Sequence, residues 1–451
     1  MLPVVVPRAE HGLSRRDVDP DALKVLCRLK EAGFKAYLVG GGVRDLLLGR
    51  RPKDFDIGTD AHPHQIKRLF RNAWIIGRRF RLVHVKVGDK VIEVATFRRQ
   101  VPLDDVAAHG KHPAQVAGPE AASPAEAARD HDDHPEAAGR AGSDHHGPRD
   151  GHVHQVHRDN SFGTDEEDAF RRDFTMNALF YDISTYSIID FVGGLDDLRA
   201  GVIRSIGDPE VRFHEDPVRM QRAVAFAARL GFALDPPVAR AIKKCGALLG
   251  TAAPARLMDE YYKILRTGLS GRVFETLRQT GLLKALAPAL HAAAGKPDLQ
   301  ASLVRLDSYR DSFDDVPAPL TTPILLGSLI VPLGFSQGTW PSWMEQDGKP
   351  GLNLGVVPLS RRDVERLHQV LMLQRRLREP SRSSHARQLL MQRSAFEDAL
   401  TWLEIHGDAP DTLAYWFEQM KTVEPAAEEP PPGRRRRRSG RRRRRGSAPP
   451  A

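Results

Sequence analysis

The spacing of hydrophobic residues divides the chain into three stretches. In the first, residues 20–100, short apolar runs alternate with segments of helical periodicity. The expected elements are an amphipathic helix over 21–33, a strand over 36–39, a helix over 43–48, a strand over 54–57, a helix over 64–72, and strands over 83–87 and 91–97 that form a β-hairpin around Gly88 and Asp89. This order predicts an α/β unit with a small mixed sheet.

The second stretch, residues 101–157, has neither helical nor strand periodicity. It is rich in Ala, His, Pro, Gly and Asp and has almost no large apolar side chains. Such a composition cannot bury enough surface to offset the entropy lost on ordering. We interpret it as a low-complexity insertion in a loop. Its histidines are interpreted as part of that loop, because no scaffold fixes the geometry that a metal site needs.

Regular patterns return after residue 158 and become almost entirely helical from about residue 204 to residue 419. Before that point a helical pattern that includes residues 171–177 is followed by an apolar strand over 188–192. The expected fold class is an α/β head followed by an all-α neck and body. The predicted domains are a head over 20–100 and 158–203, the insertion over 101–157, a neck over 204–270, a body over 271–423, and a Pro- and Arg-rich tail over 424–451.

The positive charge of the chain is concentrated in this tail. There are 67 Lys and Arg residues against 58 Asp and Glu residues, and ten of the arginines lie in 434–438 and 441–445. Removing these ten leaves 57 basic residues against 58 acidic ones, so the rest of the chain is close to neutral. An arginine run of this kind binds polyanions such as RNA with strong salt dependence and little sequence preference.

The two cysteines, Cys27 and Cys245, lie far apart in helical patterns. This placement favours buried thiols in a reducing compartment over a disulfide framework. No run of about 18 apolar residues is present, so no membrane partner is expected. A cytoplasmic location is the prediction.

Residues 38–56 carry the strongest functional signal. A short apolar strand leads into three glycines, Gly40–Gly42, which open a short helix. Glycines between a strand and a helix let backbone N–H groups face an anion. Asp54 and Asp56 lie two residues apart in the next expected strand, so their carboxylates should share a face. A phosphate cradle beside paired carboxylates predicts a site for a metal-bound triphosphate.

This segment resembles the signature of the nucleotidyltransferases of the DNA-polymerase-β superfamily. More narrowly, it is similar to the group that contains bacterial poly(A) polymerases and the CCA-adding tRNA nucleotidyltransferases. The resemblance implies that Gly41, Gly42 and Arg44 contact the triphosphate of ATP, and that Asp54 and Asp56 hold two Mg²⁺ ions, for which hard oxygen ligands are suited. The third active-site carboxylate stays open between two candidates, Glu93 and Asp173.

Residues 171–179, Arg-Arg-Asp-Phe-Thr-Met-Asn-Ala-Leu, are close to the second signature of the same family. The resemblance implies that Arg172, Asp173 and Asn177 line the nucleotide pocket. An arginine fork suits phosphate oxygens, and a carboxylate can accept a hydrogen bond from a ribose hydroxyl. The alternative interpretation is ordinary side-chain pairing along a helix.

Residues 215–223 resemble the third signature. Asp216 is expected to cap a helix that has Pro217 at its first position. The resemblance implies that Asp216 and Arg219 also meet the base edge of the incoming nucleotide, with support from Arg222. A carboxylate that accepts and a guanidinium that donates would favour ATP or CTP over GTP or UTP.

Residues 76–85 resemble the poly(A)-polymerase version of the family more than the CCA-adding version. Their arginines add positive charge beside the carboxylate pair, and the tail adds more. The candidate RNA-binding residues are Arg78, Arg79, Arg81, Arg434, Arg435, Arg436, Arg441 and Arg442.

The expected function is therefore template-independent transfer of AMP from ATP to RNA 3′ ends, in RNA processing and decay. Addition of CCA or A to tRNA is the alternative, and a catalytically inactive RNA-binding protein is the second alternative. RNA 3′ ends and ATP are the expected partners, while the sequence does not identify a partner from the RNA-decay machinery. The resemblance also implies that the neck over 204–270 recognises the nucleotide base and that the body over 271–423 binds RNA.

Overall fold

The computed structural model describes residues 3–77, 81–99, 161–336, 345–346, 349–350 and 353–422. The chain forms two compact units, one made of Met1–Arg219 with Leu230–Ala241 and the other of Met220–Arg229 with Ile242–Ala451. The predicted insertion and tail, and Arg78 and Arg79, lie outside the described residues. None of the described helices combines the length and apolarity needed to cross a membrane.

An eight-stranded mixed sheet forms the centre of the first unit, in the order β1-β8-β7-β2-β3-β6-β5-β4. Its strands are β1 Val4–Val6, β2 Ala36–Val39, β3 Ile57–Thr59, β4 Ala73–Ile76, β5 Leu82–Val87, β6 Lys90–Thr96, β7 Leu179–Asp182 and β8 Ser187–Asp190. Neighbours are antiparallel except β3 and β6, which run parallel. The mixed sheet predicted from the sequence is confirmed, although it has more strands than expected.

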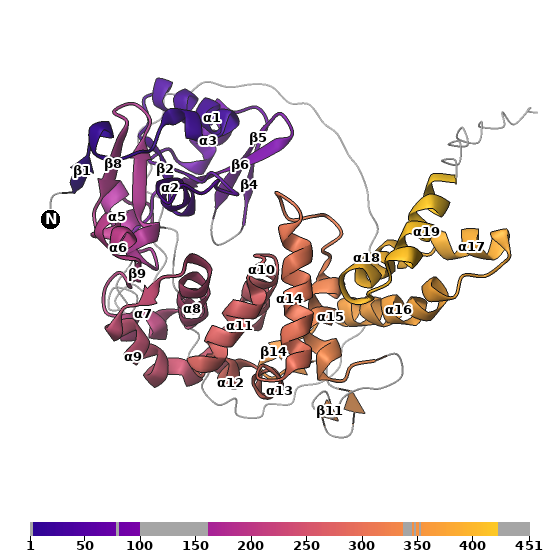
Figure 1. Cartoon of the computed structure of the whole chain (residues 1–451). Coiled ribbons are helices and arrows are strands. Elements are labelled where there is room, and N and C mark those ends of the chain that lie inside the picture. The colour runs from indigo at the N-terminus through magenta and orange to yellow at the C-terminus, as the bar shows by residue number, and fades with distance from the viewer. Residues whose placement is uncertain are drawn as a thin grey trace, which may run out of the picture. The chain divides into compact units, whose positions relative to one another are not determined.

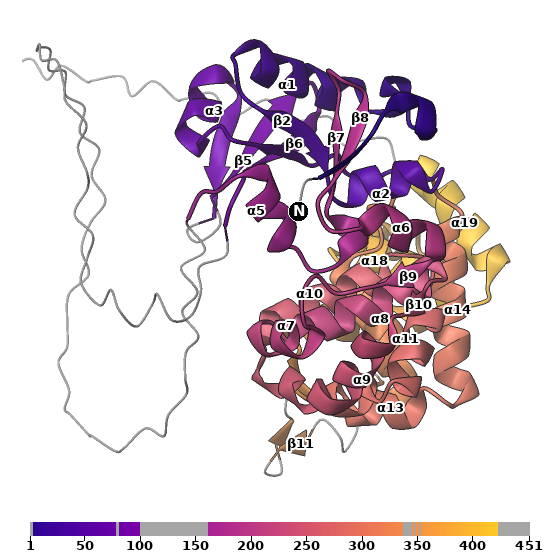
Figure 2. The same ribbon diagram turned by 90° about the vertical axis from the view of Figure 1, so that its left-hand side faces the viewer.

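Helices cover this sheet and extend the first unit beyond it. They are α1 Pro20–Glu31, α2 Gly41–Leu47, α3 Pro63–Leu69, α5 Asp165–Phe170, α6 Gly194–Ala200 and α7 Pro209–Glu215. Both ribbon views place α1 and α3 side by side along the sheet (Figures 1 and 2), where α1 contacts β2, β3 and β6 and α3 contacts β4 and β5. A short parallel pair, β9 Val202–Ile203 and β10 Ala233–Leu234, completes the unit.

The sequence predicted some elements of the first unit correctly and missed others. The β-hairpin around Gly88 is confirmed, because β5 and β6 pair from Val83 opposite Val94 to Val87 opposite Lys90. The strand expected over 54–57 starts later than predicted, because β3 begins at Ile57. Directly before it, the carbonyl of Asp56 accepts a hydrogen bond of 3.0 Å from Val39 N–H. Strands β1, β4 and β7 were not expected. Each has only three or four residues and shows little alternation, although β2 and β8 are equally short and were predicted.

The second unit is helical, as predicted. Its elements are α10 Pro254–Leu265, α11 Ser270–Gln279, α12 Leu282–Leu286, α13 Pro288–Ala293, α14 Pro297–Asp311, α15 Thr322–Ile330, α16 Arg361–Arg378, α17 Ser384–Met391, α18 Phe396–His406 and α19 Pro410–Thr422, with short strand pairs β11 Glu345–Gln346 with β12 Lys349–Pro350 and β13 Asn353–Leu354 with β14 Val357–Pro358. Helices α8 Val218–Leu230 and α9 Pro236–Cys245 cross the division between the units.

The core of the second unit lies where α14, α15, α16 and α18 pack together. Gly327 in α15 marks the closest approach, because a Cβ there would lie 2.5 Å from the ring of Trp402 and 2.7 Å from Leu367. The absence of a side chain at Gly327 therefore lets α15 pack directly against α16 and α18.

Candidate active site

The glycine turn joins β2 to α2 and touches two of the predicted signatures. Gly40 has a φ of 72°, a conformation that favours glycine. A Cβ on Gly40 would lie 2.9 Å from Nη1 of Arg172, and a Cβ on Gly42 would lie 3.3 Å from the carbonyl oxygen of Asp54. Side chains at these positions would separate the turn from both neighbours. Glycines are thus required at these positions for close packing.

The predicted carboxylate pair lies directly before β3, and a third carboxylate acts on it. Burial, with the nearby carboxylates of Glu93 and Asp54, raises the pKa of Asp56 to about 6, although Arg172 opposes this shift. Asp54 is exposed and Asp56 is partly buried. The structure therefore brings Asp54, Asp56 and Glu93 into one electrostatic site, although Glu93 comes from β6.

These carboxylates suit a divalent cation, although they do not form a closed cage. Among the described residues no three Asp, Glu, His or Cys side chains lie in a ready metal-ligating arrangement. Glu93 is 42% exposed and lies 3.7 Å from Nε2 of His84. The repulsion that raises the pKa of Asp56 is the kind that a bound cation removes, and carboxylate oxygens are the ligands that Mg²⁺ prefers. The residues present fit such an ion, with positions left for substrate oxygens.

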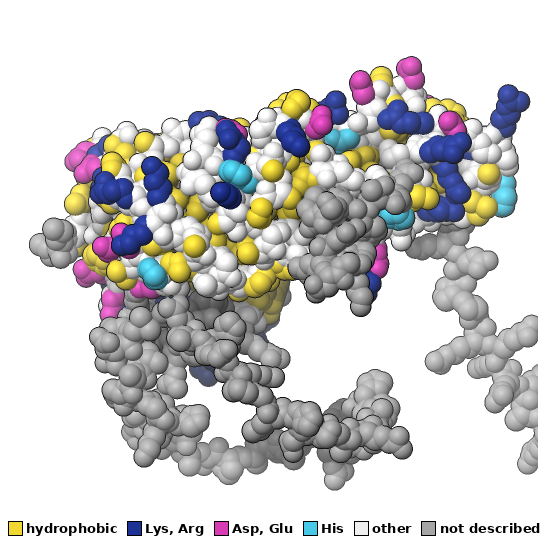
Figure 3. All heavy atoms as spheres, turned by 90° about the horizontal axis from the view of Figure 1, so that it is seen from below, with side chains coloured by type: hydrophobic (Ala, Val, Ile, Leu, Met, Phe, Trp, Pro, Cys, Tyr) yellow, Lys and Arg dark blue, Asp and Glu magenta, His cyan; other side chains and the backbone are white. Residues whose placement is uncertain are grey.

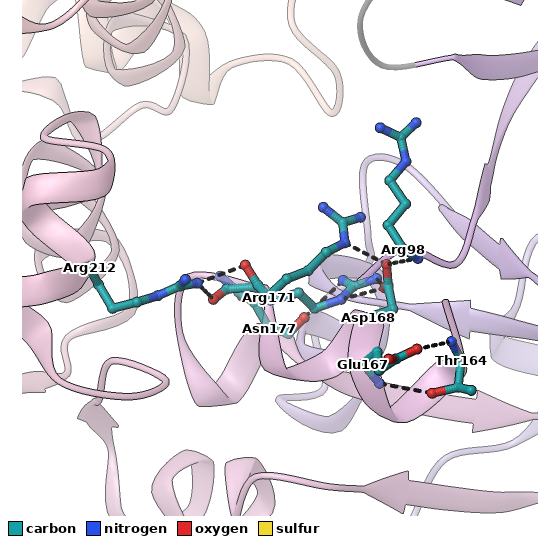
Figure 4. Close-up of polar contacts among 8 residues, drawn as sticks. Arg98, Thr164, Glu167, Asp168, Arg171, Asn177 and Arg212 are labelled. Atoms are coloured by element: carbon teal, nitrogen blue, oxygen red, sulfur yellow. Dashed lines mark hydrogen bonds and ion pairs between the residues drawn. The ribbon is translucent and has the colours of Figure 1, made fainter. Parts of the chain in front are cut away.

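Asp168 organises the second signature. Its side chain is 3% exposed and accepts from Nε of Arg171 at 2.8 Å, from Nη2 of Arg172 at 2.9 Å and from the backbone N–H of Arg98 at 3.2 Å (Figure 4). Burial alone would raise the pKa of Asp168, but Arg172 and Arg171 outweigh it and hold the pKa below its ordinary value. The guanidinium of Arg172 also lies 5.3 Å from the ring centre of Phe180. Arg172 is therefore held in a fixed position beside the glycine turn.

Asn177 links the glycine helix to the second signature. Its Oδ1 accepts from Nη1 of Arg44 at 2.7 Å, its Nδ2 donates to Oδ1 of Asp173 at 3.1 Å, and its carbonyl accepts from Arg172 at 3.1 Å. Arg44 is 3% exposed and also pairs with Asp45 at 2.7 Å. The bond between Arg44 and Asn177 connects α2 to residues 175–177. Direct contact of Arg44 with a triphosphate stays a prediction.

The expected helix through residues 171–177 is wrong in its extent. Helix α5 ends at Phe170, and the chain resumes as one 3-10 turn over Thr175–Asn177. Between them, residues 173–175 run beside residues 204–206 through hydrogen bonds from Ile206 N–H to Asp173 and from Thr175 N–H to Arg204. The side chains of Asp173 and Asn177 therefore meet across a turn and not along a helix.

Arg212 joins the second and third signatures. It is 5% exposed, and its Nη2 donates to the carbonyls of Arg171 at 2.7 Å and Arg172 at 2.5 Å, as Figure 4 shows. Its Nη1 donates to Glu215 at 2.7 Å. Glu215 also accepts from Nη1 of Arg219 at 2.9 Å, and the same nitrogen donates to the carbonyl of Arg212 at 3.0 Å. One buried guanidinium thus connects Arg172, on one side, with Arg219 on the other.

The remaining candidates are placed as follows. Asp216 lies between α7 and α8 and its Oδ1 accepts from Val218 N–H at 3.3 Å, so its predicted capping role is confirmed, with the helix beginning one residue later than expected. Arg222 belongs to the second unit, where it pairs with Glu260 at 3.4 Å and lies over Phe226. Arg81 is exposed at the start of β5, and the tail arginines lie outside the described residues.

The sequence did not single out Asp168, Arg212 or Glu215 as site residues. A signal existed for Asp168, which precedes Arg171 by three residues and Arg172 by four, the spacing of helical ion pairs. Arg212 had no such signal, because its acceptors lie 40 and 41 residues earlier in the chain. The structure adds both as residues that hold the others in place.

Two family models match the chain. One describes a poly A polymerase head domain and matches residues 36–204, and the other describes a probable RNA and SrmB-binding site of polymerase A and matches residues 231–294. The two matches leave out residues 205–230, which contain α7 and α8 with Arg212, Asp216, Arg219 and Arg222, and they leave out the tail.

Curated relatives carry two names. The chain is 44% identical over 286 residues to poly(A) polymerase I of Escherichia coli, which covers 63% of this chain and 54% of that protein. It is 40% identical over 289 residues to poly(A) polymerase I of Haemophilus influenzae, which covers 64% of this chain and 56% of that protein. It is 35% identical over 266 residues to a CCA-adding enzyme of Lactobacillus helveticus, which covers 59% of this chain and 55% of that protein. The matched part thus spans about half the length of these relatives.

Solved structures share the fold. A CCA-adding enzyme of Bacillus stearothermophilus in complex with CTP matches with a TM-score of 0.56 and 27% identity over 90% of this chain and 84% of that chain. A CCA-adding enzyme with ATP matches with a TM-score of 0.53 at 20% identity, over 95% and 89%, which supports the fold alone.

Proposed function

Because the chain belongs to the family of bacterial poly(A) polymerases and tRNA nucleotidyltransferases, we propose that it transfers AMP from ATP to RNA 3′ ends without a template. The observation that carries this proposal is the packing of the glycine turn against the carboxylate pair, since a Cβ on Gly42 would lie 3.3 Å from the carbonyl oxygen of Asp54. The raised pKa of Asp56, caused by burial and then by Glu93 and Asp54, agrees with it. A carboxylate such as Asp56, partly buried near two other acids, is stabilised in its charged form when a cation and its bound triphosphate join it.

In the proposed reaction the 3′ hydroxyl of the RNA gives its proton to solvent water and its oxygen forms a bond to the α-phosphorus of ATP. The bond from that phosphorus to the leaving pyrophosphate breaks. Two Mg²⁺ ions held by Asp54 and Asp56 would neutralise the triphosphate and activate the hydroxyl. Glu93 is the better third carboxylate, because it acts on Asp56 whereas Oδ1 of Asp173 accepts from Phe174 N–H and Asn177.

The protein's own residues would hold the nucleotide. Gly41 and Gly42 are the first two residues of α2, where backbone N–H groups have no acceptor within the helix, and these groups would bind the triphosphate. Arg172, fixed by Asp168 and Phe180, offers a positioned cation beside them. Asp216 and Arg219 would read the base edge, and in this proposal Arg212 and Glu215 set the direction of Arg219. Asn177 would support this pocket through its bond to Arg44, and the role of Arg222 in binding the nucleotide stays a prediction.

Two finer points belong to the proposal. The preference for poly(A) over CCA addition rests on the higher identity to the poly(A) polymerases and on residues 76–85. A cytoplasmic location rests on the two free cysteines, Cys27 and Cys245. CCA addition to tRNA stays the second candidate, because a CCA-adding enzyme is also more than 30% identical.

The test supplies ATP alone, CTP alone or both, with Mg²⁺, to a tRNA that lacks its 3′ end and to an unstructured RNA. We expect long A tails on both RNAs. Arrest after C-C-A on the tRNA alone would support the second candidate, and no incorporation on either RNA would leave only an RNA-binding protein.

The same assay examines the carboxylates. Asp54→Ala and Asp56→Ala should each reduce AMP incorporation by at least about 10³-fold, since each removes charge stabilisation in the transition state. Asp89→Asn is the matched control, an exposed acid in the turn of the β5–β6 hairpin, and should retain full incorporation. Incorporation that survives both alanine variants contradicts the proposed metal ligands.

A further inference from the structure

The end of α16, the loop that follows it, and α17 with the two residues after it concentrate positive charge. Residues 375–393 contain six arginines and one acid, Glu379. The arginines are Arg375, Arg376, Arg378, Arg382, Arg387 and Arg393, and we call them the α16–α17 arginine surface. The space-filling view shows Lys and Arg side chains gathered at the right-hand end, where Figure 1 places these helices (Figure 3).

Most of this charge is not neutralised by the part of the chain that the structure describes. Arg376, Arg382 and Arg393 are exposed and make no ion pair with any described residue. Glu379 pairs with Arg375 at 3.5 Å, and both side chains are exposed to solvent. By contrast, the first turns of α16 are balanced: Arg361 pairs with Glu365, and Arg366 with Asp398.

The surface also has a fixed shape. Nη1 of Arg387 donates to the carbonyls of Ser381 at 2.9 Å and Arg382 at 2.8 Å, which holds the loop between the two helices. Arg378 is fastened to the carbonyl of Gly407 at 2.6 Å. Two of the six arginines thus build the surface, and others are free to bind a ligand.

A cavity of about 340 Å³ opens between the helices. Its lining includes Arg376, Arg387 and Arg393 together with Glu379 and Leu389. Leu389 is 52% exposed, so the cavity offers an apolar wall beside guanidinium groups. Phosphate groups suit the arginines, and an unstacked base can lie on a guanidinium plane or an apolar side chain.

We infer that the α16–α17 arginine surface binds the sugar–phosphate backbone of single-stranded RNA, and that its cavity receives one phosphate with the adjoining base. This deepens the proposed function, since an enzyme that extends RNA needs a hold on the strand behind its 3′ end. The charge favours RNA over an acidic protein segment, because a strand supplies regularly repeated phosphates and bases together.

The test measures binding of a fluorescent 20-nucleotide oligo(A) to the full chain, without ATP, between 0.05 and 0.3 M salt. The double variant Arg376→Gln, Arg393→Gln should raise Kd roughly ten-fold at 0.15 M salt and reduce the slope of log K against log salt by about 1.4, the amount expected for two lost contacts to a single strand. The matched control Arg361→Gln, Arg362→Gln removes the same charge from the same helix and should change Kd by less than about two-fold.

Arginines in the tail add to the slope in every variant, so the difference between variants still reports the two substituted positions. Equal Kd and slope for the test and control variants would overturn the inference, and an acidic protein partner would then be the better occupant. A second measurement needs no variant: oligo(A) carrying 4-thiouridine should cross-link to peptides within residues 372–393, and cross-links confined to other segments would also overturn it.

Failure of this inference is distinguishable from failure of the proposed function. Loss of RNA binding in the test variant with no AMP transfer by the wild type supports the surface and contradicts the enzyme. AMP transfer by the wild type with unchanged RNA binding in the test variant supports the enzyme and contradicts the proposed RNA-binding surface.

Discussion

Arginines are concentrated in two described regions of this protein, and the two regions use them in opposite ways. In the first unit Arg171, Arg172 and Arg212 are wholly or partly buried and bonded to Asp168, to Glu215 or to backbone carbonyls. On the α16–α17 arginine surface Arg376 and Arg393 are exposed and have no carboxylate partner among the described residues.

The difference shows which arginines hold other protein groups in place and which arginines are available to bind a ligand. A buried arginine that donates to several groups is held at one place, and its loss leaves the partner groups unpaired. An exposed arginine costs little to keep and little to remove, but it can neutralise a phosphate that arrives. The first kind should therefore affect stability and selectivity, and the second RNA affinity alone.

The largest effect on stability is expected from the substitution Asp168→Asn, which tests the role of the buried arginines. The substitution leaves Arg171 and Arg172 facing a neutral amide in a buried site, and should lower the free energy of unfolding by about 3 kcal/mol. Urea denaturation measures the loss. Asp196→Asn, which removes the exposed partner of Arg199, is the control and should change little. Equal stability of the two variants would mean that Asp168 does not organise the site.

Arg212→Ala comes next. Without Arg212, Glu215 and Arg219 lose their link to residues 171 and 172, so kcat/KM for ATP should fall by about 10²-fold and CTP should be discriminated less well. Arg212→Lys should not rescue selectivity, because one ammonium cannot bond two carbonyls and a carboxylate in a fixed fork.

Steady-state incorporation of ATP and CTP separately measures both effects. Arg199→Gln, an exposed arginine of α6, is the matched control. A lowered melting temperature with unchanged ATP-over-CTP selectivity would assign Arg212 a purely structural role.

A smaller effect appears with pH. The pKa of Asp168 in the folded protein lies below its ordinary value of 3.8, so its ion pairs stabilise the fold fully above that value. This contribution is lost as the pH falls below 3.8 and through the lowered folded pKa. Stability measured from pH 6 to pH 2 should therefore fall less steeply in Asp168→Asn than in the wild type, and parallel curves would contradict the assignment.

The smallest expected effect is on the exposed surface. The double variant Arg376→Gln, Arg393→Gln should melt within about 1–2 °C of the wild type, because exposed side chains without partners contribute little to stability. A large drop in the melting temperature, by differential scanning fluorimetry, would show that these arginines are structural and would remove the contrast between the two regions.

The sequence predicted elements and residues whose cause is local. The β5–β6 hairpin followed from alternation around Gly88, and the glycine turn followed from three glycines between a strand and a helix. The four-residue strands β2 and β8 were found because each leads into glycines that mark its end, whereas β1 and β7 are as short, pair with distant partners and have no such glycines after them. The helix expected through Asp173 failed because pairing with residues 204–206 overrides its local preference.

By itself the sequence determined which chemical groups stand near one another along the chain: three glycines before a helix, two aspartates two apart, and an Arg-Arg-Asp run. The tertiary structure decided which of these groups meet. Arg44 bonds Asn177 across 133 positions, Glu93 reaches Asp56 from another strand, and Arg212 bonds residues 171 and 172 from a helix 40 positions later. Such contacts depend on how strands and helices pack, and packing energy is shared among residues that no local spacing connects.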